Sequence, residues 1–181
     1  RKQQSLLPEI TTFDDDKTGQ DTVDVLRKAS ILASRITGND NGSLGLHPAI
    51  YYYGPSGRHS TPMFLGTVSL IAEKLANNDK GFFKKFTEVR SSLEELLILN
   101  KDLIAMILQK NISRHRVGKY HELLSELIKE LSLGSEVTEE SIIKISKLEA
   151  KVLAGDFKRT SSSISPEEKS KVFIHVALKN A

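Results

Sequence analysis

The residues best suited to chemistry lie in one short stretch, where three tyrosines at positions 51–53 precede a Gly-Pro-Ser-Gly turn and an Arg-His pair. Each tyrosine offers an apolar ring with a polar hydroxyl, and Arg58 offers a planar fork of hydrogen-bond donors. His59 follows Arg58 immediately before the expected start of a helix, whose first amides are free to bind an anion. The stretch therefore predicts phosphate recognition by Arg58, His59 and those amides.

Two other interpretations of this stretch stay open. If residues 50–53 are extended, Tyr51 and Tyr53 face one side of the strand, where with His47 they would line a ligand pocket or contact a partner chain. Alternatively, the tyrosines pack onto a helical bundle and the glycine-rich turn only closes a hairpin. The turn is not a Walker-type loop, because it lacks the Gly-Lys-Ser/Thr ending.

A second basic cluster lies between two expected helices. Arg114, Arg116 and Lys119 follow one another within a few residues, and we predict that they contact phosphates of a nucleic acid or an acidic partner. The alternative is that these cations complement the carboxyl end of a helix. The histidines nearby lack the i, i+4 spacing of a helical metal pair, so no metal site is predicted.

Known catalytic patterns are missing from the sequence. It contains no Gly-x-Ser-x-Gly elbow, no His-Glu-x-x-His pair and no dinucleotide fingerprint. The acidic pairs at 94–95 and 139–140 occupy neighbouring positions that do not face each other on a helix. The acidic triplet at 14–16 is interpreted as a solvated turn rather than a cation site. We therefore predict no catalytic residue and no cofactor, and any hydrolase or nuclease activity would belong to the rest of a longer protein.

Composition fits a globular protein. Of 181 residues, 39% are hydrophobic and 27% charged, with a net charge of +3, which is a weak signal for a dedicated nucleic-acid module. The absence of cysteine excludes disulfides and thiolate metal sites and is typical of the cytoplasm. No apolar run is long enough for a transmembrane helix, and no signal peptide is recognisable. Because the chain begins with Arg1, we interpret it as a piece of a longer protein.

Apolar residues at helical spacing predict an all-α, multi-helix bundle of six or seven helices, with a short β-like hairpin or extended segment near residues 50–58. Asp21 or Thr22 would cap the first helix, and Thr138 a later one that Gly155 ends. Residues 1–20 are predicted to be a polar arm or linker. Residues 21–181 form a single helical domain, with a flexible connector near 159–164.

Residues 43–66, SLGLHPAIYYYGPSGRHSTPMFLG, resemble a segment downstream of the N-terminal domain in bacterial ParB-like-nuclease-fold proteins of the GmrSD restriction type. The residues that match the pattern are His47, Tyr51, Tyr53, Gly57 and Arg58. The resemblance implies the helical C-terminal region of a protein that handles DNA or nucleotides, in defence against foreign DNA. It implies no catalytic residue here, because the catalytic motifs of the family lie in the preceding domain.

Two functions follow as hypotheses. The first is a non-catalytic accessory module of a larger bacterial protein, which positions nucleic acid or docks the upstream catalytic domain. The second is a protein–protein interaction or homo-oligomerisation module without nucleic-acid affinity, in which the leucine-rich faces of residues 82–108 and 120–131 pair with another copy. A weaker third possibility is a small-molecule pocket lined by Tyr51, Tyr53 and Arg58. None of these involves a membrane.

Overall fold

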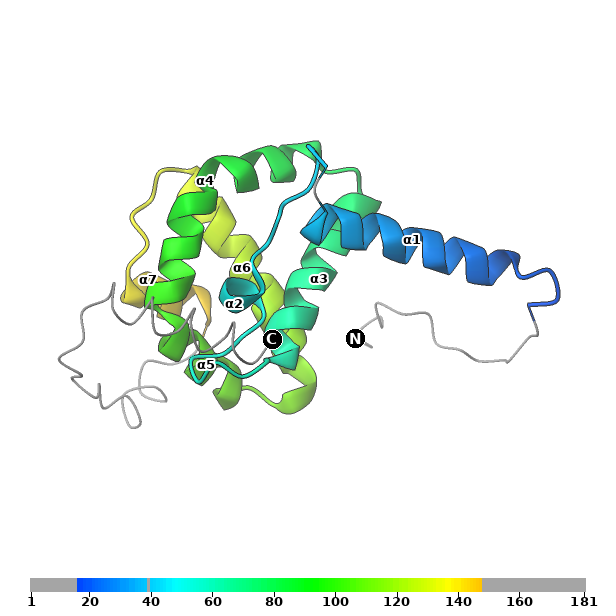
Figure 1. The fold of residues 1–181 in the computed structure, drawn as a ribbon. Helices are drawn as coiled ribbons and strands as arrows, with labels where there is room; N and C mark the ends of the chain where they lie inside the picture. The colour runs from blue at the N-terminus through cyan, green and yellow to red at the C-terminus, as the bar shows by residue number, and fades with distance from the viewer. Residues whose placement is uncertain (1–15, 39, 148–181) are drawn as a thin grey trace. The chain divides into compact units, whose positions relative to one another are not determined.

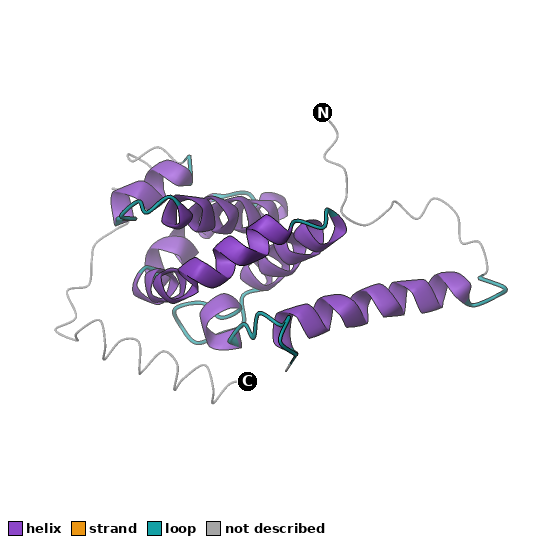
Figure 2. Cartoon of the chain, turned by 90° about the horizontal axis from the view of Figure 1, so that it is seen from above, coloured by secondary structure: helices purple, strands orange, loops and turns teal. Residues whose placement is uncertain are grey.

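The computed structural model describes residues 16–38 and 40–147, and their regular structure is helical, without a strand (Figures 1 and 2). The predicted all-α bundle is confirmed. The chain divides into two compact units, residues 1–45 and 46–181. Within the described part, no helix is both long and apolar enough to cross a membrane. The helices are α1 (Gln20–Thr37), α2 (Pro48–Tyr51), α3 (Thr61–Ala76), α4 (Lys80–Leu99), α5 (Lys101–Lys110), the 3-10 turn η1 (Ser113–His115), α6 (Arg116–Ser132) and α7 (Glu139–Ile145).

Helix α1 belongs to the first unit and begins differently from the prediction. Gly19, with φ of +69°, takes the N-cap position, so neither Asp21 nor Thr22 caps the helix. Asp16 supplies the missing acceptor, because its Oδ2 accepts a hydrogen bond from the Thr22 backbone N–H at 2.8 Å. This bond favours the charged carboxylate and lowers the pKa of Asp16. Asp16 is thus part of a helix start, while Asp14 and Asp15 lie outside the described residues.

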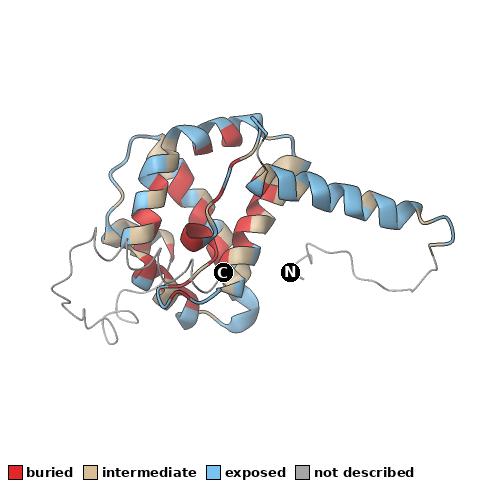
Figure 3. Ribbon diagram, in the orientation of Figure 1, coloured by how far each residue is buried: buried red, intermediate tan, exposed pale blue. Residues whose placement is uncertain are grey.

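The core of the second unit is built around α6. Figure 1 shows this helix running between α3 and α4, and α2 packs against α3 and α4. Five large side chains on one face of α6 are buried: Tyr120, Leu123, Leu124, Leu127 and Ile128. Figure 3 shows the buried residues on the faces that the helices turn toward one another. The predicted leucine-rich stripe of this helix is therefore a core face.

A glycine sets how closely α3 and α6 approach. A Cβ atom added to Gly66 would lie 2.9 Å from the Cβ of Tyr120 and 3.0 Å from the backbone oxygen of Val117. Both partners lie in the first turns of α6, and Gly66 lies in the second turn of α3. The amino-terminal halves of the two helices therefore pack against each other, and both helices begin at the same end of the unit.

Several helix boundaries follow from local signals. Asp79 caps α4 by accepting a hydrogen bond from the Phe82 backbone N–H at 2.9 Å. Thr138 caps α7, as predicted, by accepting from the Ser141 backbone N–H at 3.3 Å. However, α7 ends at Ile145, well before the predicted stop at Gly155, since Lys147 adopts a positive φ of 54°. The connector near 159–164 and the last predicted helix lie outside the described residues.

The segment before the glycine-rich turn is helical where an extended conformation was predicted. Pro48 to Tyr51 form α2, because proline suits the first helical position and His47 Nδ1 accepts a hydrogen bond from the Ala49 backbone N–H at 3.3 Å. The prediction of an extended Ile50 and Tyr51 is therefore wrong. The β-like part is a single antiparallel bridge between Tyr53 and His59.

Candidate nucleic-acid interface

The turn after α2 holds Arg58 and His59 at the surface. The backbone N–H of Gly54 donates to the Arg58 carbonyl at 2.8 Å, which closes the loop beside the Tyr53–His59 bridge. Gly57 sits in the left-handed region at φ of +69°, where a side chain would be strained. Arg58 and His59 are both exposed, immediately before α3. Their predicted position next to a helix start is confirmed.

The three tyrosines do not share one environment. Tyr51 is fully buried, and its hydroxyl donates to Glu94 Oε1 at 3.2 Å. The same carboxylate oxygen accepts a hydrogen bond from Arg90 Nε at 2.8 Å. Burial and the nearby carboxylate raise the pKa of Tyr51 far above its ordinary value. Tyr53 is half-buried instead, so the two side chains predicted to share one side occupy different environments.

His47 and a lysine that sequence reasoning missed both stabilise α2. His47 serves as the N-cap described above. At the other end of the helix, Lys101 Nζ donates to the carbonyls of Ala49 and Ile50, although the lysine is only 4% exposed. Burial lowers the pKa of Lys101 from 10.5 to about 7. Its position in the sequence could have revealed this role, because residue 101 falls on the buried stripe of α5, where a lysine is unusual.

The second basic cluster splits into structural and exposed members. Arg116 Nε donates to the Asn111 carbonyl at 3.0 Å and its Nη2 to the Gln109 carbonyl at 3.2 Å, so this arginine satisfies carbonyls at the end of α5. The Lys119 side chain is only 15% exposed and lies 3.9 Å from a carboxylate oxygen of Glu122. Arg114 is exposed. Of the three predicted phosphate contacts in this cluster, Arg114 is the exposed one, and its Nε donates a hydrogen bond to His115 Nε2 at 3.1 Å.

The two basic segments lie at the same end of the second unit. The turn with Arg58 leads into α3 and η1 with Arg114 leads into α6, and the starts of these helices pack together through Gly66. Figure 1 shows both connections beyond the same ends of α3 and α6. The sequence contains no Asp or Glu over residues 41–72 or 103–121. We call the exposed basic residues of these connections, together with Lys110 at the end of α5, the basic end: Arg58, His59, Lys110, Arg114 and His115.

The positive charge of the basic end has two sources. The side chains contribute formal charges, and the amino termini of α3 and α6 each contribute a partial positive charge from aligned peptide dipoles. The closest carboxylate along the chain on the α6 side is Glu122, which pairs with Lys119. The arrangement is suited to attract and hold polyanions.

A second polar cluster, also missed in the sequence, joins α3 to α6. Ser69 Oγ lies 2.8 Å from His121 Nδ1, and His121 Nε2 lies 3.0 Å from Glu73 Oε2. Lys74 binds the other carboxylate oxygen at 2.9 Å, and this bond, together with the histidine, lowers the pKa of Glu73. Ser69 and Glu73 are one turn apart on α3, but their partner lies on another helix, so no sequence spacing marks the cluster.

The connectivity of this cluster is that of a serine–histidine–carboxylate relay, yet the surroundings do not support acyl transfer. Such chemistry needs backbone N–H groups aimed at a developing oxyanion. Ser69 lies in the interior of α3, where backbone N–H groups are used by the helix itself. Its hydroxyl also lies 3.1 Å from the Gly66 carbonyl. We therefore assign the cluster a structural part, as a polar clamp between α3 and α6.

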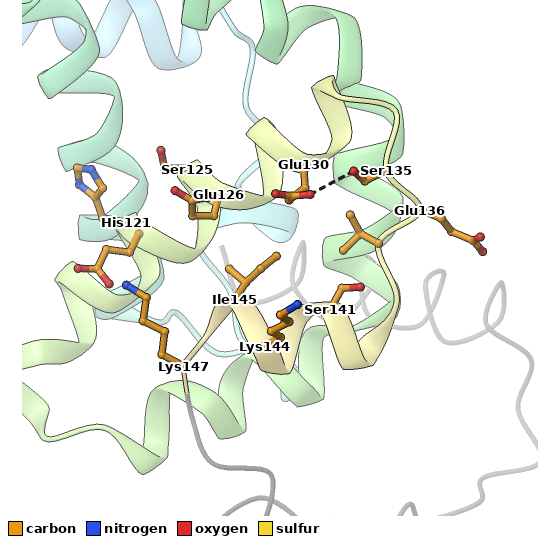
Figure 4. A pocket seen from close by; sticks show the side chains of 12 residues that line it. His121, Ser125, Glu126, Glu130, Ser135, Glu136, Ser141, Lys144, Ile145 and Lys147 are labelled. Atoms are coloured by element: carbon orange, nitrogen blue, oxygen red, sulfur yellow. Dashed lines mark hydrogen bonds between the residues drawn. The ribbon is translucent and has the colours of Figure 1, made fainter.

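A cavity of about 620 Å³ lies between α6 and α7 (Figure 4). In Figure 4, His121 stands at its edge, toward α3, Glu126 and Glu130 line it from α6, and Lys144 of α7 and Lys147 line the opposite side. Glu126 is paired with Lys129 at 2.9 Å, and Glu130 accepts a hydrogen bond from Ser135 at 3.1 Å. No group of three or more potential metal ligands occurs among the described residues. The carboxylates of this cavity are thus largely satisfied within the protein.

Comparison with known proteins gives no independent guide to the basic end. No protein-family model, no curated protein and no solved structure matches this chain.

Proposed function

We propose that the second unit is a non-catalytic accessory module that positions nucleic acid within a larger bacterial protein acting on DNA or nucleotides. The observation that carries the proposal is the basic end, where two segments without acidic residues meet. Arg58 and Arg114 present exposed guanidinium groups there, which suit phosphate oxygens. The resemblance of residues 43–66 to a segment of DNA-handling proteins supports the same class of function.

The proposal implies binding that depends on salt. Each phosphate that a protein neutralises releases condensed counterions, so the logarithm of the binding constant falls with the logarithm of the salt concentration. With Arg58 and Arg114 as the main contacts, the slope would be about −1.4 for a single strand and about −1.8 for a duplex. A binding constant that depends this weakly on salt concentration is expected of an auxiliary site that assists a stronger binding site.

Fluorescence anisotropy of labelled single- and double-stranded DNA and RNA, with the full chain at low and moderate salt, tests the proposal. The double variant Arg58→Ala/Arg114→Ala should lose most of the binding. A matched control is Lys84→Ala/Lys85→Ala, which removes the same charge from exposed positions on α4. No binding by the wild-type chain at low salt, or equal weakening in both double variants, would contradict the proposal.

An interaction module is the second candidate, and one observation favours it. Helix α1 of the first unit exposes Val25, Leu26 and Ile31, each by more than half. In contrast, the apolar faces within residues 82–108 and 120–131 are buried in the core of the second unit. A second copy or a partner protein would therefore bind elsewhere, and α1 is the place to look. If a second copy binds there, light scattering after size-exclusion chromatography of the full chain would give the mass of a dimer.

A further inference from the structure

Aromatic rings form a continuous row from the core to the surface of the basic end. The Tyr52 ring meets Phe64 edge to face at 5.2 Å between centroids, and Phe64 lies 5.6 Å from His59. His59 in turn meets Tyr53 edge to face at 5.9 Å. Tyr52 is buried, Phe64 and Tyr53 are half-buried, and His59 is exposed. The outer members of the row therefore present aromatic surface to solvent.

The outer rings are held in place before any ligand arrives. Tyr53 and His59 face each other across the backbone bridge, and the Ser60 N–H donates to the Tyr52 carbonyl at 2.8 Å. Phe64 is fixed by its place in the first turns of α3. Because the rings have little freedom to lose, binding to them costs little conformational entropy.

A solvent-facing aromatic row beside arginines has a preferred ligand chemistry. Phosphate contacts alone do not distinguish a duplex from a single strand, since both expose a charged backbone. Aromatic rings gain further affinity from bases that are unpaired, because only those bases offer a free face for stacking. The His59 ring next to Arg58 is suited to combine base stacking with a phosphate contact.

We propose that Tyr53, His59 and Phe64 form a stacking surface for unpaired bases, so that the basic end binds single-stranded nucleic acid in preference to a duplex. The inference rests on the proposed function and names its ligand. Arg58 and Arg114 hold the phosphates of the strand, and the aromatic row holds its bases. One base stacked on these rings raises affinity roughly 5- to 150-fold over the phosphate contacts alone.

Three labelled ligands of equal length test the inference: a single-stranded oligonucleotide, an abasic strand with the same phosphates, and a duplex. The full wild-type chain should bind the single strand at least 5-fold more tightly than the abasic strand or the duplex. His59→Ala should lower affinity for the single strand toward that for the abasic strand, and should weaken abasic binding less than single-strand binding, since the arginines of the basic end remain. His59→Phe keeps an aromatic ring and should restore most of the preference.

The outcomes separate the two proposals. Equal wild-type affinity for the base-containing and abasic strands overturns the stacking surface but leaves polyanion binding by the basic end intact. No binding to any of the three ligands at low salt overturns both. If His59→Ala fails to fold by circular dichroism, the wild-type comparison of the three ligands still decides the matter.

Discussion

Replacing Gly66 with alanine is the sharpest test of how α3 and α6 form the basic end. The added methyl group would lie 2.9 Å from both the Cβ and Cδ1 atoms of Tyr120 and 3.0 Å from the Val117 backbone oxygen. Tyr120 is fully buried and the oxygen is part of α6, so neither can move aside without shifting the helix. Overpacking of this kind costs about 1–3 kcal/mol. Alanine also gains about 1 kcal/mol over glycine inside a helix.

The net expectation is a loss of about 2 kcal/mol for Gly66→Ala, since the contacts involve both a ring and a backbone atom and place the overpacking cost at the upper end of its range. Gly81→Ala is the matched control, because its added Cβ would meet nothing nearer than Asp79 Oδ1 at 3.5 Å, an ordinary contact. This control should be unchanged or more stable by up to about 1 kcal/mol.

Urea unfolding followed by circular dichroism measures both variants, with equal slopes indicating the same unfolding transition. A Gly66→Ala protein as stable as wild type would refute the close approach of the two helices. The contact that places Arg58 and Arg114 at one end of the second unit would then be absent as well.

Two further predictions concern the second unit. Lys101 has a folded-state pKa of about 7 against 10.5 when unfolded, so the unfolded chain binds more protons between these values and wild-type stability should rise with pH across that window. The urea midpoint of Lys101→Met should not rise with pH across that window. If the midpoints of both proteins change equally with pH, Lys101 is not buried beneath α2. Thr138→Ala removes the acceptor for the Ser141 N–H and should cost about 1 kcal/mol, measured by thermal unfolding, with unchanged stability counting against the cap.

Much of the fold was predictable because it depends on local signals. Thr138 indicated the start of α7 from the sequence. Local signals of the same kind mark α3, where Pro62 lies in the first turn, and α4, which Asp79 caps. The leucines of α6 recur at helical spacing, which predicted its buried face without knowledge of its partners. Such features involve residues within a few positions of one another, where sequence spacing and structure coincide.

The conformation of α2 was not predictable in the same way. β-branched and aromatic residues at 50–53 favour an extended chain, but propensity is overridden by tertiary contacts. Here the His47 cap stabilises a helical turn together with Lys101, which binds two carbonyls of α2 from 51 and 52 residues away. No pattern in the sequence predicts a contact between residues so far apart in the chain.

The candidate site shows the same division. The sequence predicted that Arg58 and His59 lie just before a helix, and the structure adds that both are exposed. Other contacts depend on how the helices pack. Arg116 binds carbonyls at the end of α5, and His121 of α6 contacts Ser69 and Glu73 of α3. Sequence alone therefore grouped the basic residues by type, whereas only the packing separates the structural from the exposed ones.

The most direct test of the basic end is a titration of the isotope-labelled full chain with a short single-stranded oligonucleotide at low salt, followed by backbone chemical shifts. We expect shift changes concentrated at Arg58, His59 and Arg114, with the α6–α7 face around Glu126 and Lys144 unaffected. Changes centred on that face, or no changes at low salt, would contradict it.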